Sequence, residues 1–268
     1  MKIKTIRSLA VAAAACTAVP ASVTHAQEGS ADSRALEEII VTARKRDEAL
    51  QEVPIAISVL GAATIEQFGV NDVESVARLT SGLTYDQGVL PIDTRPVIRG
   101  VSSLRGRPNV GVLVDFVDVS SEALTVAGGG ITTNLRLLDL ERIEVIKGPK
   151  SALYGRGAFT GALHYVTKRP GDTFSGGVTV GYDEYDTSDL RLSIGGPIAA
   201  DKLNARLILS HYDTPGYYVN PNTGGELGAS EVTGAALGLE WTLSDRTTAY
   251  FRVEHSDEWH SQRPEVHV

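Results

Sequence analysis

The stretch of residues 141–170, ERIEVIKGPKSALYGRGAFTGALHYVTKRP, joins two short strand patterns through a Gly-Pro break and a segment with three further glycines. In the first pattern apolar and charged residues alternate, so we expect a half-buried strand over Arg142–Ile146 in which Glu144 lies beside Lys147. The glycines permit backbone angles closed to other residues, or a close approach to a neighbouring wall. The stretch therefore predicts a strand, a tight glycine-rich turn and a returning strand over Leu163–Thr167.

A phosphate-binding loop is the enzyme-like interpretation of these glycines. That loop needs G-x-x-x-x-G-K followed by Ser or Thr, whereas Gly148 and Gly155 are spaced differently and Arg156 follows. No nucleophile, base and acid stand in a recognisable arrangement, and we expect His164 and His211 to be strand residues rather than ligands. The formal charge of -8 argues against nucleic acid as a partner. We therefore expect no enzyme, no catalytic residue, no metal site and no cofactor.

The chain begins with the pattern of an exported protein. Basic residues precede the apolar run Ser8–Val19, and small residues follow as far as Ala26. This is the order of a secretory signal peptide, and the run is shorter than the roughly 20 residues that a spanning helix needs. We expect residues 1–26 to be removed together with Cys16, the only cysteine. Lipoprotein processing at Cys16 is the alternative.

Residues 27–52 begin with a polar, aperiodic segment that we expect to be flexible. The segment leads into LEEIIVTARKRDEALQEVP, where the β-branched run Ile39–Thr42 favours an extended chain. This run is either an edge strand of the following domain or a tethered strand offered to the sheet edge of a partner. The residue pattern leaves both interpretations open.

Residues 53–170 predict a small α+β domain with short helices. Asn71 and Glu74 have capping-box spacing ahead of an apolar helical face that ends at Gly82. The other expected elements of this domain are strands at Pro54–Leu60, Val97–Arg99 and Val110–Val119, and short helices at Ala62–Phe68 and Leu135–Leu140.

After Gly171 the sequence alternates with period two. Val232–Leu243 is the clearest case, with leucine and tryptophan on one face and mainly glycine and alanine on the other. Apolar-outward, small-inward segments of about ten residues are typical of outer-membrane barrels, although a soluble sandwich is the alternative. Long and short links alternate, as they do between the two rims of such barrels. The other expected strands are Phe174–Tyr182, Leu190–Ile194, Leu203–His211 and Thr248–His255.

The chain as a whole resembles the TonB-dependent outer-membrane receptors. The resemblance rests on EEIIVTARKRDEALQEVPIAISVL, VIRGV, VGVLVDFVDVS and LLDLERIEVIKGPKSALYGRGAFTGALHYVTKRP, in the order that the family has them. It implies an α+β plug domain over residues 53–170, followed over residues 171–268 by the first antiparallel strands of a transmembrane β-barrel of about 22 strands. Because an open sheet edge cannot lie in lipid, we expect an incomplete barrel, and hence a gene fragment, a truncation or a degenerate copy.

The resemblance implies active uptake of a bulky nutrient across the outer membrane, most often a ferric siderophore. In the family a short N-terminal box pairs with TonB, which an inner-membrane complex energises, and strand addition is the expected mode of pairing. The residues of this TonB box are Glu38, Ile39, Ile40, Val41, Thr42 and Ala43. A plug-only periplasmic module that binds TonB or ligand without transport is the alternative function.

Charged residues of two kinds are singled out by the resemblance. The first kind is expected to form charge contacts between plug and barrel, and its candidates are Arg99, Glu144, Lys147 and Glu240. The alternative is that these are ordinary solvated charges. Apical plug loops are expected to touch the cargo, and their candidates are Arg95, Arg105 and Arg107.

Two residues depart from the family pattern. Lys147 stands where the family usually has Arg, which keeps the charge but loses the forked geometry, so we expect weaker pairing there. The turn commonly written Val-Asp-Gly-Val reads Val114-Asp115-Phe116-Val117. Phe does not readily take the positive backbone angles of a tight primed turn, so we expect this turn to be rearranged.

Overall fold

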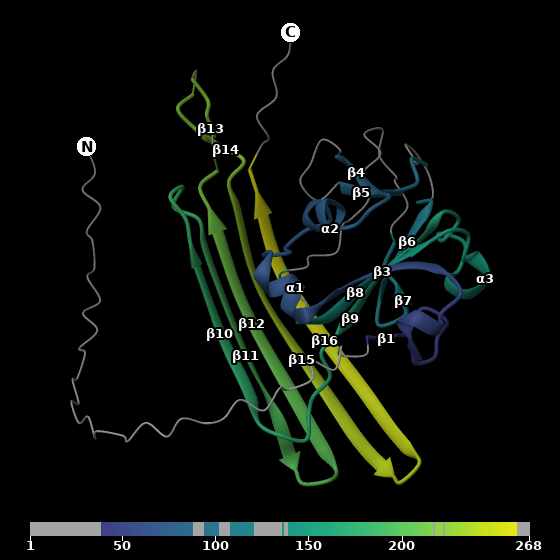
Figure 1. The fold of residues 1–268 in the computed structure, drawn as a ribbon. Helices are drawn as coiled ribbons and strands as arrows, with labels where there is room; N and C mark the ends of the chain where they lie inside the picture. The colour runs from purple at the N-terminus through teal and green to yellow at the C-terminus, as the bar shows by residue number, and fades with distance from the viewer. Residues whose placement is uncertain are drawn as a thin grey trace, which may run out of the picture. The chain divides into compact units, whose positions relative to one another are not determined.

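The computed structural model describes residues 39–87, 94–101, 108–120, 136, 139–216, 218–221 and 223–261. Within these residues the chain forms a small α+β domain and, after it in sequence, a five-stranded antiparallel sheet that we call the strand sheet; both can be followed in Figure 1. The predicted leader, Glu38, Arg105 and Arg107 lie outside the described residues. None of the helices in the described ranges is long and apolar enough to cross a membrane.

The α+β domain is built on a mixed sheet with the strand order β3-β8-β9-β6-β7. Its β6 and β9 pair in parallel, and the other pairs are antiparallel. The strands are β3 Ala56–Gly61, β6 Val110–Val114, β7 Val117–Asp118, β8 Leu140–Lys147 and β9 Gly161–Thr167. The predicted strands around residues 141–170 are thus confirmed. The expected half-buried character of the first is wrong, because Ile143, Glu144, Val145 and Ile146 all have no exposed surface.

Short helices and a hairpin complete the domain. They are η1 Leu50–Glu52, α1 Ala62–Gln67, α2 Val73–Leu79, α3 Ser151–Tyr154, β4 Leu83–Gln87 and β5 Thr94–Ile98. The helix predicted over Leu135–Leu140 is wrong at its end, because Leu140 already belongs to β8.

The predicted helix after residue 70 is confirmed, but its cap is not the predicted one. Asp72 is the N-cap rather than Asn71, and Ser75 is its partner rather than Glu74. The Asp72 carboxylate accepts from Ser75 N at 2.7 Å, and the Ser75 hydroxyl accepts from Asp72 N at 3.2 Å. This shift by one residue is possible because a short serine hydroxyl can return the bond that Glu or Gln usually makes.

The sheet of the α+β domain has an apolar core on each face. One core packs α1 and α2 against residues such as Ile143, Val145 and Tyr165. The other core includes Ala43 of the N-terminal segment, and its remaining buried members are Leu113, Ile146, Tyr154, Ala158 and Ala162. The segment that the sequence left open between two interpretations therefore contributes to a core.

The Tyr165 side chain is fully buried, and its hydroxyl has no hydrogen-bond partner among the described residues. Burial raises the pKa of this phenol, and the Asp72 carboxylate raises it further. Because a buried unsatisfied hydroxyl carries a desolvation penalty, Tyr165→Phe is expected to leave the free energy of unfolding unchanged or raise it by about 1 kcal/mol.

Thermal unfolding of the purified chain measures this effect. Tyr154→Phe is the matched control, because the Tyr154 hydroxyl donates to Ala43 O at 2.6 Å. That control is expected to lose about 1 kcal/mol. A loss in Tyr165→Phe as large as the loss in the control would contradict the prediction.

The strand sheet has the order β10-β11-β12-β15-β16, and every neighbouring pair is antiparallel. All five predicted strands are confirmed, and most are longer than predicted. Their bounds are β10 Ser175–Tyr182, β11 Ser188–Ala199, β12 Leu203–Thr214, β15 Ser230–Ser244 and β16 Thr247–His260. The longest link contains a small hairpin of β13 Tyr218–Val219 and β14 Glu226–Leu227.

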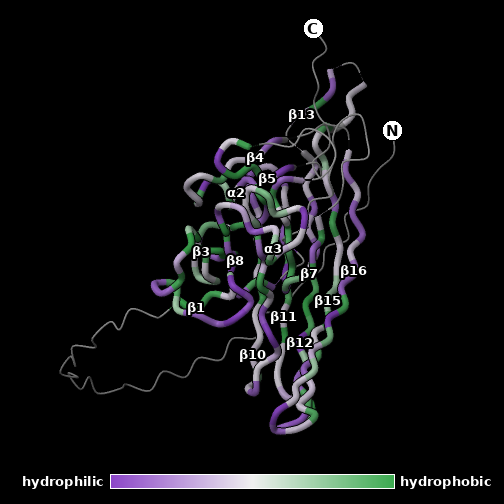
Figure 2. Tube along the Cα trace, turned by 90° about the vertical axis from the view of Figure 1, so that its right-hand side faces the viewer, coloured by the Kyte–Doolittle hydropathy of each residue, from purple (hydrophilic) through white to green (hydrophobic). Residues whose placement is uncertain are grey.

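The two faces of the strand sheet differ in chemistry. On β15 the small residues Gly234, Ala236 and Gly238 are buried, whereas Trp241 and Leu243 are exposed. The register places exposed apolar residues of neighbouring strands opposite one another, as in Val178↔Leu192↔Leu209. The alternation along these strands is visible in Figure 2. The predicted apolar-outward, small-inward pattern is confirmed.

Candidate functional site

The predicted box lies on the α+β domain as half of a two-stranded ribbon. Its β1, Ile40–Val41, pairs antiparallel with β2, Glu48–Ala49, in the register Ile40↔Ala49. Ile39 and Ile40 are exposed, whereas Val41 and Ala43 are fully buried. We call residues 39–43 the box segment. It is not an edge strand of the main sheet, because β1 pairs with β2 in a separate two-stranded sheet.

Four hydrogen bonds fasten the box segment to β8 and α3. Thr42 donates to Glu144 Oε1 twice, from its backbone N at 2.9 Å and from its Oγ1 at 3.1 Å. The Tyr154 hydroxyl of α3 donates to Ala43 O at 2.6 Å. Arg142 Nη2 of β8 donates to Thr42 Oγ1 at 3.3 Å. All four bonds are made by Thr42 and by the fully buried Ala43. They hold it by backbone and side chain together.

Glu144 is the centre of this attachment. Arg142 Nε donates to Glu144 Oε1 at 2.8 Å. His164 of β9 lies opposite Glu144 of β8 in the sheet register, and its Nδ1 is 3.4 Å from Glu144 Oε2. Burial by itself would raise the pKa of Glu144. The hydrogen bonds from His164, from Thr42 N and from Arg142 outweigh burial, so the pKa of this carboxyl lies below its ordinary value. The carboxylate is therefore ionised when the box segment is docked.

The turn between β6 and β7 meets the same histidine. Asp115 and Phe116 have φ of 46° and 69°, so the tight primed turn is present and the expected rearrangement is wrong. Phe116 N donates to His164 Nε2 at 3.2 Å, and the two rings lie 4.4 Å apart. The Asp115 carboxylate accepts from Thr167 N and Thr167 Oγ1. These contacts compensate for the strain that a non-glycine residue has at positive φ.

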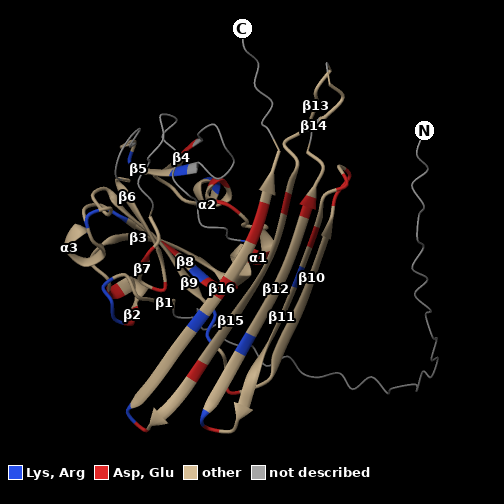
Figure 3. Ribbon diagram, turned by 180° about the vertical axis from the view of Figure 1, so that it is seen from behind, with Lys and Arg blue, Asp and Glu red and all other residues tan. Residues whose placement is uncertain are grey.

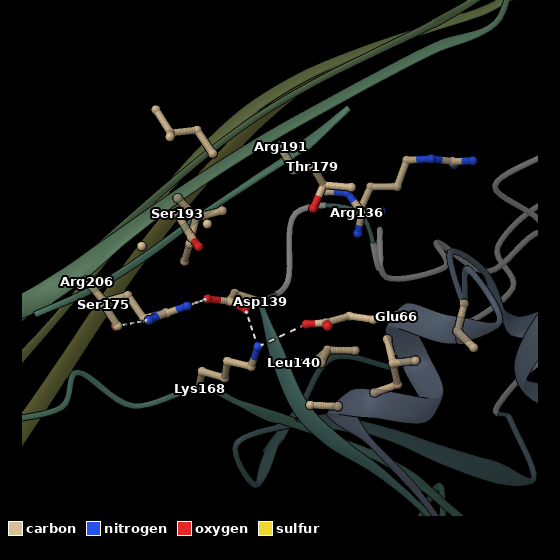
Figure 4. A pocket seen from close by; sticks show the side chains of 17 residues that line it. Glu66, Arg136, Asp139, Leu140, Lys168, Ser175, Thr179, Arg191, Ser193 and Arg206 are labelled. Carbon is tan, nitrogen blue, oxygen red and sulfur yellow. Dashed lines mark hydrogen bonds and ion pairs between the residues drawn. The ribbon is translucent and has the colours of Figure 1, made fainter. Parts of the chain in front are cut away.

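A second polar cluster lies where the α+β domain meets the strand sheet. Arg206 of β12 pairs with Asp139, which stands just before β8, and Lys168 Nζ lies 3.5 Å from both Asp139 and Glu66. Figure 4 shows this chain of ion pairs at one side of a pocket with a volume of about 510 Å³. The same pocket is lined by Arg191 and other polar residues of β10 and β11. The cluster ties the two parts of the chain by charge.

Two further arginines connect the domain with the strand sheet. Arg169 lies 3.7 Å from the Glu240 carboxylate, and its guanidinium stacks over the Tyr250 ring at 3.9 Å. Arg136 stacks over the Tyr212 ring at 3.8 Å. In Figure 3 charged residues form only isolated bands along the long strands.

The predicted charge contacts fall into two groups. Glu240 does contact a residue that precedes the strand sheet, whereas Glu144 bonds only to groups of the α+β domain and does not face a carboxylate of the strands. The reason is its complete burial beneath the box segment. Lys147 Nζ donates to Ser58 Oγ at 2.9 Å, and the exposed Arg99 lies beside Gly148.

The predicted cargo residues are only partly described. Arg95 lies in β5, opposite Asp86 of β4, whereas Arg105 and Arg107 lie outside the described residues. Sequence reasoning missed Asp139, Arg206 and the role of His164. Strand parity could have placed Glu144 and His164 on one face, but nothing in the sequence pairs residue 139 with residue 206.

Comparison with known proteins gives a consistent result. Residues 49–162 match the family described as the TonB-dependent Receptor Plug Domain. The vitamin B12 transporter BtuB of Vibrio vulnificus strain YJ016 is 30% identical over 215 residues, which are 80% of this chain and 33% of that protein. The pesticin receptor of Yersinia pestis is 25% identical over 205 residues, which are 76% of this chain and 29% of that protein. The chain thus spans about a third of the length of the curated relatives it matches.

Solved structures share the fold. The ferric yersiniabactin uptake receptor FyuA from Yersinia pestis gives a TM-score of 0.66 at 23% identity, covering 76% of this chain and 32% of that one. The pyoverdine outer membrane receptor FpvA from Pseudomonas aeruginosa PAO1 gives a TM-score of 0.67 at 21% identity, covering 82% of this chain and 30% of that one. All these proteins are transporters or receptors rather than enzymes, in agreement with the expectation of a role other than catalysis.

Proposed function

The chain belongs to the TonB-dependent receptors, and from this premise we propose that it is the N-terminal part of an outer-membrane receptor that takes up a bulky nutrient. Residues 53–170 are the plug, residues 171–268 supply the first strands of the barrel, and residues 1–26 are the export signal. The apolar outward face of the strand sheet supports a place in lipid. The observation that carries the proposal is a plug domain with its box segment docked on the sheet.

TonB is the proposed partner of the box, residues 38–43. The exposed Ile39 and Ile40 present side chains on an extended backbone, which is the form that strand addition recognises. A pull on this segment acts on the core of the plug, because Val41, Thr42 and Ala43 are bonded or packed there. Force on the box segment is thus transmitted to β8 through Glu144.

The cargo class comes from the relatives. One relative is a vitamin B12 transporter, and another is a ferripyoverdine receptor from Pseudomonas aeruginosa, 25% identical over 212 residues. We take a ferric siderophore as the cargo, with Arg95, Arg105 and Arg107 as its cationic contacts. Anionic chelates suit guanidinium groups, which is the physical basis for choosing these residues.

Uptake by cells that express the receptor tests the proposal. Labelled ferripyoverdine, ferric yersiniabactin and vitamin B12 are supplied to cells with wild-type receptor, Ile40→Pro or the control Ile40→Val. Proline removes a backbone N–H from the exposed strand and is expected to lower uptake at least about tenfold, whereas valine keeps the strand.

The receptor level in the outer membrane is measured in parallel. Normal uptake by Ile40→Pro at a normal receptor level would contradict the proposal that TonB binds the box. Uptake of vitamin B12 alone would overturn the siderophore assignment and leave the family role intact.

A further inference from the structure

His164 is buried at a junction between the box segment and the β6–β7 turn. Its ring has no exposed surface and contacts Glu144 on one side and Phe116 on the other. Thr42 of the box segment bonds to the same carboxylate. A continuous path of hydrogen bonds therefore runs from Thr42 through Glu144 and His164 to Phe116.

The geometry fixes which nitrogen of His164 carries the proton. Phe116 N–H can only donate, so Nε2 must accept and is unprotonated. Nδ1 then carries the hydrogen and donates to Glu144 Oε2. The docked state thus holds a neutral imidazole beside an ionised carboxylate.

A second proton on His164 does not fit the docked state. A proton on Nε2 would face the N–H of Phe116, so that bond would be lost. The nearest charges are the Glu144 carboxylate and the Arg142 guanidinium on β8; Asp115 in the turn already bonds to Thr167, and Tyr154 of α3 adds a neutral phenol. Arg142 pairs with Glu144 and also with the half-exposed Glu141, so a second proton on His164 would add a further positive charge to a site without exposed surface.

Lifting the box segment relieves this cost, because Thr42 lies on the Glu144 carboxylate and its removal admits water. The coupling is reciprocal: if docking disfavours the second proton, the second proton disfavours docking. Imidazole is the side chain that changes charge in the range of pH that an outer membrane meets.

We propose that His164 is a positioning residue that holds Glu144 under Thr42 while neutral, and that its second protonation releases the box segment for its partner. The proposal rests on the proposed function, since release of the box segment has a role only if TonB binds the box. It makes the availability of the box depend on external acidity.

A nitroxide label on Ile40→Cys reports the state of the box segment in the full chain. Ile40 is exposed, and the only native cysteine, Cys16, lies in the predicted leader. The mobile fraction of the label is expected to rise about fivefold between about pH 8 and about pH 5, and to fall again on return. His164→Gln and His164→Asn cannot take the second proton and are expected to abolish this change.

His211→Gln is the matched control, because His211 lies in the strand sheet and bonds to Thr233; it is expected to keep the wild-type response. Glu144→Gln is expected to give a mobile label at both pH values. A wild-type response that is flat with pH, which needs no variant, would overturn the proposal, and so would a pH response retained in both His164 variants. The measurement uses neither TonB nor cargo, so its failure would leave the uptake experiment unaffected.

Discussion

Gly161→Ala is expected to destabilise the plug more than the addition of a methyl group at any other glycine of the plug. A Cβ at residue 161 would lie 2.2 Å from Ile146 O and 2.7 Å from Ile98 Cδ1. The first of these atoms is backbone of the neighbouring strand β8, paired with β9 through Lys147↔Gly161. The two central strands would have to separate, so we expect a loss of at least about 3 kcal/mol in the free energy of unfolding.

Amide hydrogen exchange in peptides from β8 and β9 measures this loss, because both native tryptophans lie in the strand sheet and do not report on the plug. Gly171→Ala is the control, since the nearest atom to its Cβ would be 3.9 Å away. Equal protection of β8 and β9 in the two variants would show that the strands tolerate the methyl group.

Gly161 also shows what the sequence can and cannot predict. The glycine-rich stretch predicted a close approach of the backbone to a wall, and the strands on either side were predicted within a few residues. The wall itself is β8 of the same domain, which pattern alone cannot identify. The periodic strands after residue 171 were predictable because alternation and burial arise from the same pleat.

Local chemistry was harder to predict where a neighbour in space decides the outcome. The cap moved from Asn71 to Asp72 because Ser75 could complete it. Phe116 takes a positive φ because His164 and Thr167, 48 or more residues away, hold the turn. Glu144 was predicted as a plug–barrel contact or a solvated strand charge, but it is buried beneath Thr42 and beside Arg142 and His164. Each miss is a tertiary contact that overrides a local preference.

Asp139 and Arg206 are the same case at longer range. They lie 67 residues apart and in different parts of the chain. Nothing in their local sequence differs from that of other charged residues, because the pairing depends on which strand follows the plug and in which register. Residues that fasten a plug to its surroundings are thus found from the structure rather than from motifs.

Glu144→Ala is expected to be the second most damaging substitution. It removes the acceptor of Thr42 N and Thr42 Oγ1 and the partner of Arg142, whose side chain is nearly buried. Because breaking a buried pair leaves an uncompensated charge, we expect a loss of about 3–5 kcal/mol from the plug and a mobile box segment. Unfolding of the purified chain in denaturant measures the first effect, and protease sensitivity near residue 42 measures the second.

The same substitution removes a pH dependence with a defined sign. The pKa of Glu144 is lowered in the folded chain, so its stabilisation is complete above the ordinary value and is lost as the pH falls below that value toward the folded-state pKa. Glu141→Ala is the control, because Glu141 pairs with the same Arg142 but its side chain is half exposed. We expect that control to cost at most about 1 kcal/mol. If Glu141→Ala cost as much as Glu144→Ala, the charge of Arg142 and not the anchoring of Thr42 to Glu144 would account for the stability. The box segment would then be held by Arg142, Tyr154 and apolar packing.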